Sequence, residues 1–409
     1  MIETEYPELI SKDLNSNPQI QTILSDSQLT EFSEKVEMWD ITFSTRQISY
    51  LSHSMFRFFG KFPAPIARHL IKRYTLEEDV VLDAMVGSGT SAIESLLLNR
   101  NFYCADINPI SKLLVNTKCT HLRQDKILEE LQKIEEQYNS SENNFIIKNN
   151  EIAIEKRSLD HWFLPETVDS LSKIMHSINK IKNRKLKNFF LTCFISIIRK
   201  VSRATSQQGR LFKDELSAKK DAWEDFEKVA IRYSKIVDSL PKTKFRGVTF
   251  FNQDIRKLKL YKDPKLVICH PPYFNVYKFS TIFTLELAWL NENRKEISKN
   301  ELREFFKIGK KENVDIYVND LYDSIKNIST QLKKGAILAV MMGDTTIHGE
   351  HIPTTKLFLD KTKELPLSLE VIAIRKPKYT EASWVTSQRR TTEKIGSHLS
   401  DFILVFRRI

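Results

Sequence analysis

The sequence predicts an α/β fold, in which an open, mostly parallel sheet carries helices on both faces and a helical lobe is inserted between its strands. Three observations support this prediction. Short, almost continuously apolar runs alternate with helical patterns along most of the 409 residues,. The last two runs follow one another without a clear helix between them, which suits an antiparallel pair,. A mostly helical stretch, residues 121–245, interrupts the alternation.

Seven runs have the apolar, β-branched composition of buried strands,. A helix is expected from Ser91, between the first and the second run. The expected strands are 80–85, 101–107, 247–255, 265–270, 336–344, 369–376 and 401–408.

The remaining segments divide the chain into three parts. Residues 1–45 are polar and predict an N-terminal extension with some helix. Residues 46–120 and 246–409 form the main domain, and 121–245 form the inserted lobe. From Asn179 to Lys213 there are ten Lys and Arg residues and no Asp or Glu, so the lobe is expected to carry a basic face,.

Composition narrows the function further. A net charge of +11 favours a polyanionic partner, although a Lys-rich composition alone can produce it,. The four cysteines show no paired spacing, which predicts neither disulfides nor a zinc site and favours a reducing, cytoplasmic setting,. The first ten residues lack the apolar core of a signal peptide,. The longest apolar stretch, 189–198, is too short to span a bilayer, so no membrane association is expected,.

A first candidate site lies where the first expected strand turns into a helix. Asp83 precedes a glycine-rich turn made of Gly87, Ser88, Gly89 and Thr90. Glycines let a ligand approach the backbone, and a helix N-terminus offers free N–H groups. The run differs from the dinucleotide pattern G-x-G-x-x-G and lacks the lysine of a phosphate-binding loop,. A pyrophosphate ligand is therefore disfavoured.

Two further carboxylates follow the next two strands. Asp106 can accept hydroxyl groups of a ribose, and Asp254 can accept an amino group from an adenine edge,. A ribose and an adenine without phosphate indicate S-adenosylmethionine. Each aspartate taken alone suits a surface turn or a helix cap, but three at successive strand ends favour a cofactor site.

A second candidate site is the sequence His270, Pro271, Pro272 and Tyr273, at the end of the fourth expected strand. Neither proline has a backbone N–H, so the strand must stop there. Together with Asp83 and the glycine-rich turn, this loop resembles the S-adenosylmethionine-dependent DNA amino-methyltransferases of restriction–modification systems. Their loop is [D/N/S]-P-P-[Y/F/W], and His270 departs from it. Segments 56–74, 104–118 and 277–290 extend the resemblance, which covers about 46–120 and 246–409.

The resemblance implies a Rossmann-like, seven-stranded methyltransferase sheet with an antiparallel last strand. It implies transfer of a methyl group to the exocyclic amino group of a flipped base in double-stranded DNA, with a restriction endonuclease as a separate partner. The Leu-Glu-Leu segment within 277–290 favours cytosine N4 over adenine N6. An RNA base methyltransferase and a DNA-binding protein without activity remain the alternatives.

The chemistry of methylating an amino group accounts for the residues of this loop. An amino nitrogen conjugated to a ring is a poor nucleophile unless acceptors hold its hydrogens. The Pro-Pro turn fixes one backbone carbonyl, and the side chain at 270 supplies a second acceptor. Neutral imidazole accepts a hydrogen bond, whereas imidazolium does not. Tyr273 offers a ring on which a flipped base can stack. A degenerate loop in an inactive protein is the other interpretation of His270.

The remaining candidates are charged residues. Lys61 can approach the carboxylate of the cofactor or be an exposed lysine, and Asp344 can lie near the base or in a turn. Basic residues of the lobe and of a later cluster that includes Arg375, Lys376 and Lys378 are candidate DNA contacts, with a solvated face as the alternative. The predicted DNA-binding set is Lys182, Arg184, Lys185, Lys187, Arg199, Lys200, Arg203, Arg210, Arg389 and Arg390.

Overall fold

The computed structural model describes residues 6–13, 36–141, 156–205, 211–214, 219–242, 249–274, 278–302, 312–347, 350–376, 391–392, 397–398 and 400–409. Its strands are β1 (Ile10–Asp13), β2 (Val36–Asp40), β3 (Val80–Asp83), β4 (Asn101–Ala105), β5 (Thr249–Phe251), β6 (Leu266–Cys269), β7 (Ile337–Gly343), β8 (Thr345–Ile347), β9 (Glu350–Ile352), β10 (Leu367–Arg375), β11 (Thr391–Thr392), β12 (Ser397–His398) and β13 (Asp401–Arg408).

The helices of the main domain are α3 (Ala64–Tyr74), α4 (Thr90–Leu97), α5 (Pro109–Lys118), α11 (Phe279–Ile282), α12 (Thr284–Trp289), α13 (Arg294–Asn300), α14 (Glu312–Ser329) and α15 (Thr354–Thr362). Two short 3-10 helices, η2 (Leu51–Ser54) and η4 (Ile255–Lys257), lie beside them. The inserted segment contains α6 (Gln124–Ser140), α7 (Lys156–Trp162), α8 (Pro165–Lys180), α9 (Arg184–Val201) and α10 (Trp223–Asp238).

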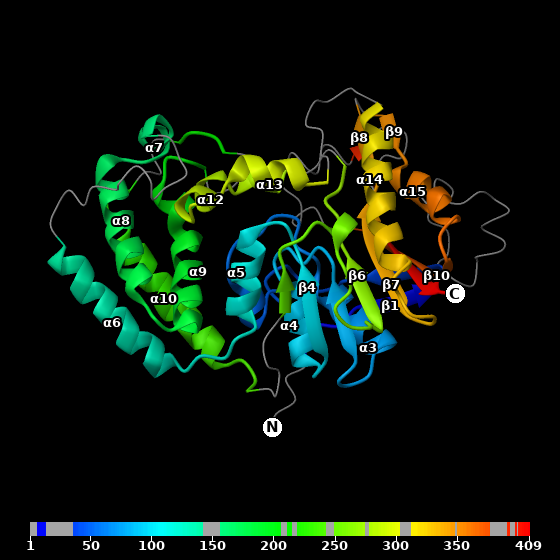
Figure 1. Ribbon diagram of the computed structural model, residues 1–409, viewed down its shortest axis with the longest axis horizontal. Helices are drawn as coiled ribbons and strands as arrows, with labels where there is room; N and C mark the ends of the chain where they lie inside the picture. Colours follow the sequence, from blue (N-terminus) through cyan, green and yellow to red (C-terminus); the bar gives the residue numbers. More distant parts are fainter. Residues whose placement is uncertain are drawn as a thin grey trace.

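One nine-stranded sheet organises the molecule, in the order β1-β2-β10-β13-β7-β6-β3-β4-β5 (Figure 1). Strands β5, β4, β3, β6 and β7 are parallel neighbours, whereas β13 is antiparallel to both β7 and β10. All seven expected strands belong to this sheet, and the last strand is antiparallel as predicted. The predicted fold class is therefore confirmed.

The N-terminal residues differ from the expected polar extension. Strand β2 pairs in parallel with β10, and β1 pairs with β2 in antiparallel fashion. Val36 and Trp39 of β2 are buried, and Trp39 is fully covered. These side chains continue the apolar face of the sheet, which is why residues 36–40 pair with its edge, and residues 14–35 of the expected extension lie outside the described residues,.

Helices cover both faces of the sheet. A buried cluster on one face joins α3 and α4 to residues such as Val81, Ile268 and Met341. A second cluster joins α14 and α15 to residues such as Leu82 and Val340. Successive strand residues point to opposite faces, so the continuous apolar runs of the sequence supply both clusters.

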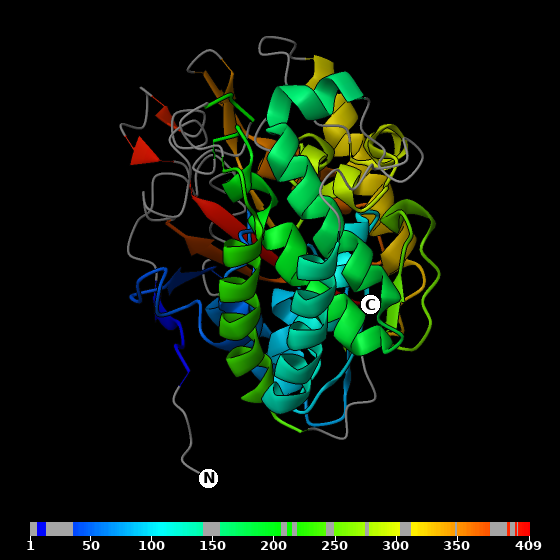
Figure 2. The same cartoon turned by 90° about the vertical axis from the view of Figure 1, so that its left-hand side faces the viewer.

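The helices α6–α10 form a lobe at one end of the sheet (Figure 1), and Figure 2 shows this lobe toward the viewer. Its core includes Phe190, Phe194 and Phe226 and continues into α5 and α12 through Leu114 and Trp289. The lobe therefore packs on the main domain through one shared hydrophobic core. Among the helices of the described residues, none is long and apolar enough to cross a membrane.

Candidate functional site

A cavity of about 230 Å³ opens beyond the carboxyl ends of the parallel strands. This is the edge at which ligands bind in open α/β sheets. The cavity brings together residues that the sequence places more than 200 positions apart. The sequence-predicted residues that line it are Lys61, Asp83, Gly87, Ser88, Asp106, Asp254, His270, Pro271, Pro272 and Tyr273.

The glycine-rich turn shapes one wall of the cavity. Gly87 has a φ of 48°, in the left-handed region that glycine adopts most readily,. Its backbone N–H donates to Asp106 Oδ2 over 2.8 Å, which ties the turn after β3 to the end of β4. The buried amine of Lys118 donates to Ser88 O over 2.9 Å from behind. The turn is therefore fixed before any ligand arrives.

Gly89 and Thr90 play a different part from the one predicted. Neither lines the cavity, since Gly89 caps α4 and Thr90 begins it. A Cβ on Gly89 would stand 3.0 Å from Val115 Cγ2, and its φ is 83°. Gly89 therefore allows α4 to pack closely on α5, and the ligand-facing backbone is that of Gly87 and Ser88.

Asp83 and Asp106 are buried carboxyl groups held by N–H and O–H donors. Asp83 accepts from Met85 N over 3.0 Å and from the hydroxyl of Ser91. Asp106 also accepts from Asn108 N over 2.9 Å. Burial raises the pKa of Asp83 to about 7 and raises the pKa of Asp106, against the opposing effect of these hydrogen bonds,. A cation placed in the cavity would favour the ionised form of both.

Lys61 lines the cavity and is joined to a buried polar network. Its Nζ donates to His53 O over 2.6 Å, and burial lowers the pKa of Lys61 to about 8. Burial lowers the pKa of His53 to about 4, so the neutral ring donates from Nε2 to Glu94 over 2.7 Å. Glu94 also accepts from Arg68 over 2.9 Å. These contacts anchor the segment before α3 to helix α4.

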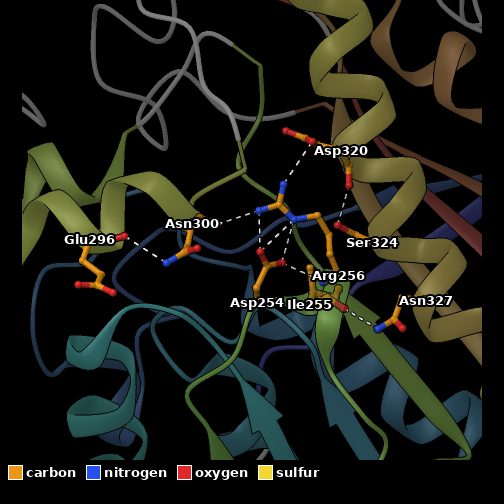
Figure 3. Close-up of polar contacts among 8 residues, drawn as sticks. All are labelled: Asp254, Ile255, Arg256, Glu296, Asn300, Asp320, Ser324 and Asn327. Atoms are coloured by element: carbon orange, nitrogen blue, oxygen red, sulfur yellow. Dashed lines mark hydrogen bonds and ion pairs between the residues drawn. The ribbon is translucent and has the colours of Figure 1, made fainter.

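The carboxylate of Asp254 is engaged by Arg256 (Figure 3). Asp254 accepts from the backbone N–H of Arg256 over 2.9 Å, from its Nε over 3.0 Å and from its Nη2 over 2.6 Å. Arg256 further contacts Asp320 of α14 over 3.2 Å and donates to Asn300 O. Asp254 therefore lines the cavity, as predicted. Its carboxylate also belongs to a network of polar contacts that links the end of β5 to α13 and α14, and the sequence did not predict this network.

The His-Pro-Pro-Tyr loop closes the cavity above β6. The rings of His270 and Tyr273 meet edge to face, with centroids 5.4 Å apart, and Phe62 lies 5.2 Å from His270. The hydroxyl of Tyr317 on α14 donates to Pro272 O over 2.9 Å. This hydrogen bond from α14 holds the loop in position.

Apart from Arg199, the predicted DNA contacts separate into three groups. Lys182, Arg184, Lys185 and Lys187 cluster at the start of α9, where Asn188 O accepts from Thr117 near the end of α5. Helix α5 begins at the cavity edge and runs away from it, so this cluster lies at the end of α9 that is remote from the cavity. Lys200 and Arg203 lie at the near end. Arg210, Arg389, Arg390 and Lys378 fall outside the described residues.

Arg199 is not a surface contact, contrary to the sequence prediction. It is 9% exposed, and its Nε lies 3.3 Å from Glu286 Oε1 of α12. Its guanidinium also donates to Ile282 O and lies over the ring of Phe59. Because its guanidinium is buried, Arg199 has no surface to offer a phosphate and instead connects the lobe to the main domain.

Two other charged candidates, Asp344 and Arg375, are buried. Asp344 is 1% exposed and accepts from Thr355 N over 2.9 Å and from His351 over 2.8 Å, so it organises the β8–β9 hairpin and does not line the cavity. Arg375 is 4% exposed and donates to Asp401 Oδ2 over 2.9 Å. Both Arg375 and Asp401 line the cavity. No local sequence pattern predicts this pair, because 26 residues separate its members.

The chain is similar to known DNA methylases. The model of the DNA methylase family matches residues 4–115, a range that includes β1–β4 and the glycine-rich turn. Type II methyltransferase M.MvaI from Kocuria varians is 23% identical over 266 residues, and Type II methyltransferase M.BsoBI from Geobacillus stearothermophilus is 26% identical over 349 residues. The matches cover 60% and 74% of this chain. Residues 4–115 are thus similar to the DNA methylase family, and the longer matches are to Type II methyltransferases, in agreement with the resemblance of the motifs.

These matches span 58% of M.MvaI and 66% of M.BsoBI, less than two thirds of either relative. Among solved structures, the chain is similar to TrmN from Thermus thermophilus, with a TM-score of 0.32 and 9% identity over 86% of this chain and 50% of that one. It is similar to the [4+2]-cyclase SpnF, with a TM-score of 0.35 and 8% identity over 87% of both chains. Scores this low carry no argument about function.

Proposed function

We propose that this protein transfers a methyl group from S-adenosylmethionine to the exocyclic amino group of a base in double-stranded DNA. The observation that carries the proposal is that one cavity joins the glycine-rich turn and Asp106 to the His-Pro-Pro-Tyr loop. The DNA methylase family and the names of the Type II relatives support the reaction class.

The residues of the cavity suit a nucleoside that carries a positive charge and no phosphate. Asp83, Asp106 and Glu301 place carboxyl groups in its walls, and Met85 and Ile107 provide apolar surface. Among the described residues that line it, Lys61 and Arg375 carry positive charges, and neither belongs to the glycine-rich turn. S-adenosylmethionine supplies an electrophilic methyl group on a sulfonium when it is bound.

The chain's residues would hold the two reactants in line. Asp106 would accept the ribose hydroxyls, and Lys61 would face the carboxylate of the methionine part. Pro271 O and the His270 ring would accept the two hydrogens of the target amino group, which directs the nitrogen lone pair toward the methyl group. Tyr273 would stack on the flipped base. The rigid Pro-Pro turn, braced at Pro272 by Tyr317, would keep these acceptors in place.

The test is mass analysis of nucleosides from unmethylated DNA incubated with the protein and labelled S-adenosylmethionine. We expect labelled N4-methylcytosine or N6-methyladenine. Gly87→Val should abolish the label, because its side chain would stand in the cavity wall and against Phe58, 3.3 Å from the position of a Cβ.

Two outcomes would overturn the proposal. Tight binding of DNA and cofactor without any methylated nucleoside would indicate a DNA-binding protein without activity. A label confined to RNA in a parallel incubation would indicate an RNA methyltransferase.

We further propose that a restriction endonuclease acts separately at the same DNA sequence. Cleavage of unmodified DNA but not of the methylated product by such a partner would support this.

A further inference from the structure

A buried ion pair lies in the wall of the cavity, across the sheet from the glycine-rich turn. Arg375 ends β10 and Asp401 begins β13, and the two residues are direct partners in the antiparallel register. They are 4% and 3% exposed, and both line the same cavity as His270. Burying two charges costs free energy unless they pair with each other or contact a ligand.

The register of the strands places this pair on the same face as His270. One buried cluster contains Ile268 of β6, Met341 of β7, Ile403 of β13 and Ala373 of β10. On each of these strands, the residue two positions nearer to this edge of the sheet follows the same order: His270 for β6, Gly343 for β7, Asp401 for β13 and Arg375 for β10. Since side chains repeat their direction every second residue, Asp401 and Arg375 face the side of the sheet that His270 faces.

The spacing of the strands suits a base between these groups. Strand β10, which ends at Arg375, is the third neighbour of β6, which corresponds to about 14 Å across the sheet,. The side chains of His270 and Arg375 both line the cavity between these strands, which leaves room for a pyrimidine edge with a hydrogen bond of about 3 Å at each end,. A base whose amino group meets His270 would therefore turn the rest of its pairing edge toward the guanidinium.

That edge differs between the two bases whose amino groups can be methylated. Beside the amino group, cytosine presents two acceptors, N3 and O2. Adenine presents the acceptor N1 and then a C–H group, which accepts nothing. A guanidinium carries its N–H donors in one rigid plane and can donate to two neighbouring acceptors at once.

We propose that Arg375, oriented by Asp401, is the residue that determines base specificity, and that it donates to N3 and O2 of a flipped cytosine. The proposal rests on the amino-methyltransferase function argued above and assigns cytosine N4 as its target. Asp401 holds the guanidinium in the plane of the base and balances its charge while the site is empty of DNA. A bidentate contact of this kind discriminates between bases by about 5- to 150-fold.

The first measurement is the identity of the methylated nucleoside made by the wild-type protein. We expect N4-methylcytosine. Formation of N6-methyladenine instead would overturn the assignment of Arg375 while leaving the methyltransferase function intact. Absence of both products would count against the function itself, so the two failures are distinguishable.

The second measurement uses Arg375→Lys, which keeps the charge beside Asp401 but loses the planar pair of donors. We expect kcat/KM for cytosine methylation to fall by about tenfold or more, with the melting temperature and S-adenosylmethionine affinity close to wild type. Arg375→Met combined with Asp401→Asn removes both charges and should lose more activity. If Arg375→Lys methylates cytosine as fast as wild type, the pair only joins β10 to β13, and the proposal is wrong even if the double variant fails to fold.

Discussion

At the scale of single residues, His270 is the departure from the loop pattern [D/N/S]-P-P-[Y/F/W] that most affects methyl transfer. It occupies the position where similar loops have Asp, Asn or Ser, and its ring lines the cavity between Phe62 and Tyr273. A neutral imidazole supplies one acceptor, and a carboxylate or hydroxyl can supply the same contact. The side chain at 270 is therefore expected to act in the transition state more than in binding.

We predict that His270→Ala lowers the single-turnover rate of methylation by about 100-fold, the scale of one lost preorganised hydrogen-bonding group. DNA affinity should remain close to wild type. His270→Asp and His270→Ser should retain most of the activity, because each restores an acceptor. Equal rates for His270→Ala and wild type would mean that the carbonyl of Pro271 holds the amino group without help from residue 270.

Two buried groups with shifted pKa values predict how cofactor affinity depends on pH. Burial raises the pKa of Asp83 to about 7, so Asp83 becomes neutral below that pH and attracts the cationic cofactor less,. Burial lowers the pKa of Lys61 to about 8, so above that pH Lys61 loses the charge that faces the carboxylate of the cofactor. Affinity for S-adenosylmethionine should therefore be highest between about pH 7 and pH 8.

Calorimetry across pH on the DNA-free protein tests this prediction. Asp83→Asn should remove the acid-side decline, and Lys61→Met should remove the alkaline-side decline. Asp323→Asn, which alters an exposed carboxylate on α14, is the matched control and should leave both. A flat wild-type profile from pH 6 to pH 9 would show that neither group faces the cofactor.

At the scale of elements, the two glycines of the turn serve different neighbours. Gly87 faces the cavity, whereas Gly89 lets α4 approach α5. We predict that Gly89→Ala destabilises the protein by about 1–3 kcal/mol more than Gly335→Ala, since both positions have positive φ but only the Cβ at 89 meets a neighbour, Val115, at 3.0 Å,. Thermal melting of the two variants provides the comparison. Equal losses would mean that Val115 moves aside at little cost.

The helix α9 has one end near the cavity and one end far from it. An α-helix of its 18 residues is about 27 Å long, so DNA with a base in the cavity meets the near end first,. We predict that neutralising Lys200 and Arg203 flattens the slope of log affinity against log salt by up to about one unit per lost phosphate contact.

The matched comparison neutralises the four residues at the far end of α9, which are Lys182, Arg184, Lys185 and Lys187. This variant should change the slope of log affinity against log salt less. The reverse order would show that DNA runs along the outer length of the lobe. It would then support the original prediction from sequence, in which this cluster is the main phosphate contact.

At the scale of the whole molecule, the lobe and the main domain share one core and one buried ion pair. Arg199 of α9 and Glu286 of α12 lie together in that core, and burial raises the pKa of Glu286. We predict that Arg199→Ala lowers the free energy of unfolding by about 3–5 kcal/mol, because it leaves a buried carboxyl group without its cation.

The double variant Arg199→Met with Glu286→Leu should recover most of that loss, because apolar side chains of similar size can replace a buried pair. Denaturant unfolding measures both effects. A single cooperative transition is expected in each variant. Two separate transitions in wild type would contradict the shared core and indicate that the lobe unfolds as its own unit.

The sequence by itself determined seven strands of the sheet, the class of fold and several of the residues that line the cavity. Short apolar, β-branched runs between helical segments are stable in the middle of a covered sheet, and residues that follow parallel strands meet at its carboxyl edge. Asp83, Asp106 and His270 were therefore predictable from local patterns alone. The run of ten basic residues without an acidic one, from Asn179 to Lys213, was visible as well, but the position of these residues relative to the cavity was not.

Only the tertiary structure decided which charged groups face one another. Arg199 lies in a basic run of the sequence yet pairs with Glu286 in the core, and Arg256 occupies the carboxylate of Asp254. Arg375 meets Asp401 because β10 and β13 are adjacent and antiparallel, in a register that brings two distant residues to the same edge. Electrostatic contacts depend on distances in space, and a sequence pattern records only distances along the chain. The base that the cavity accepts is therefore a property of the folded sheet.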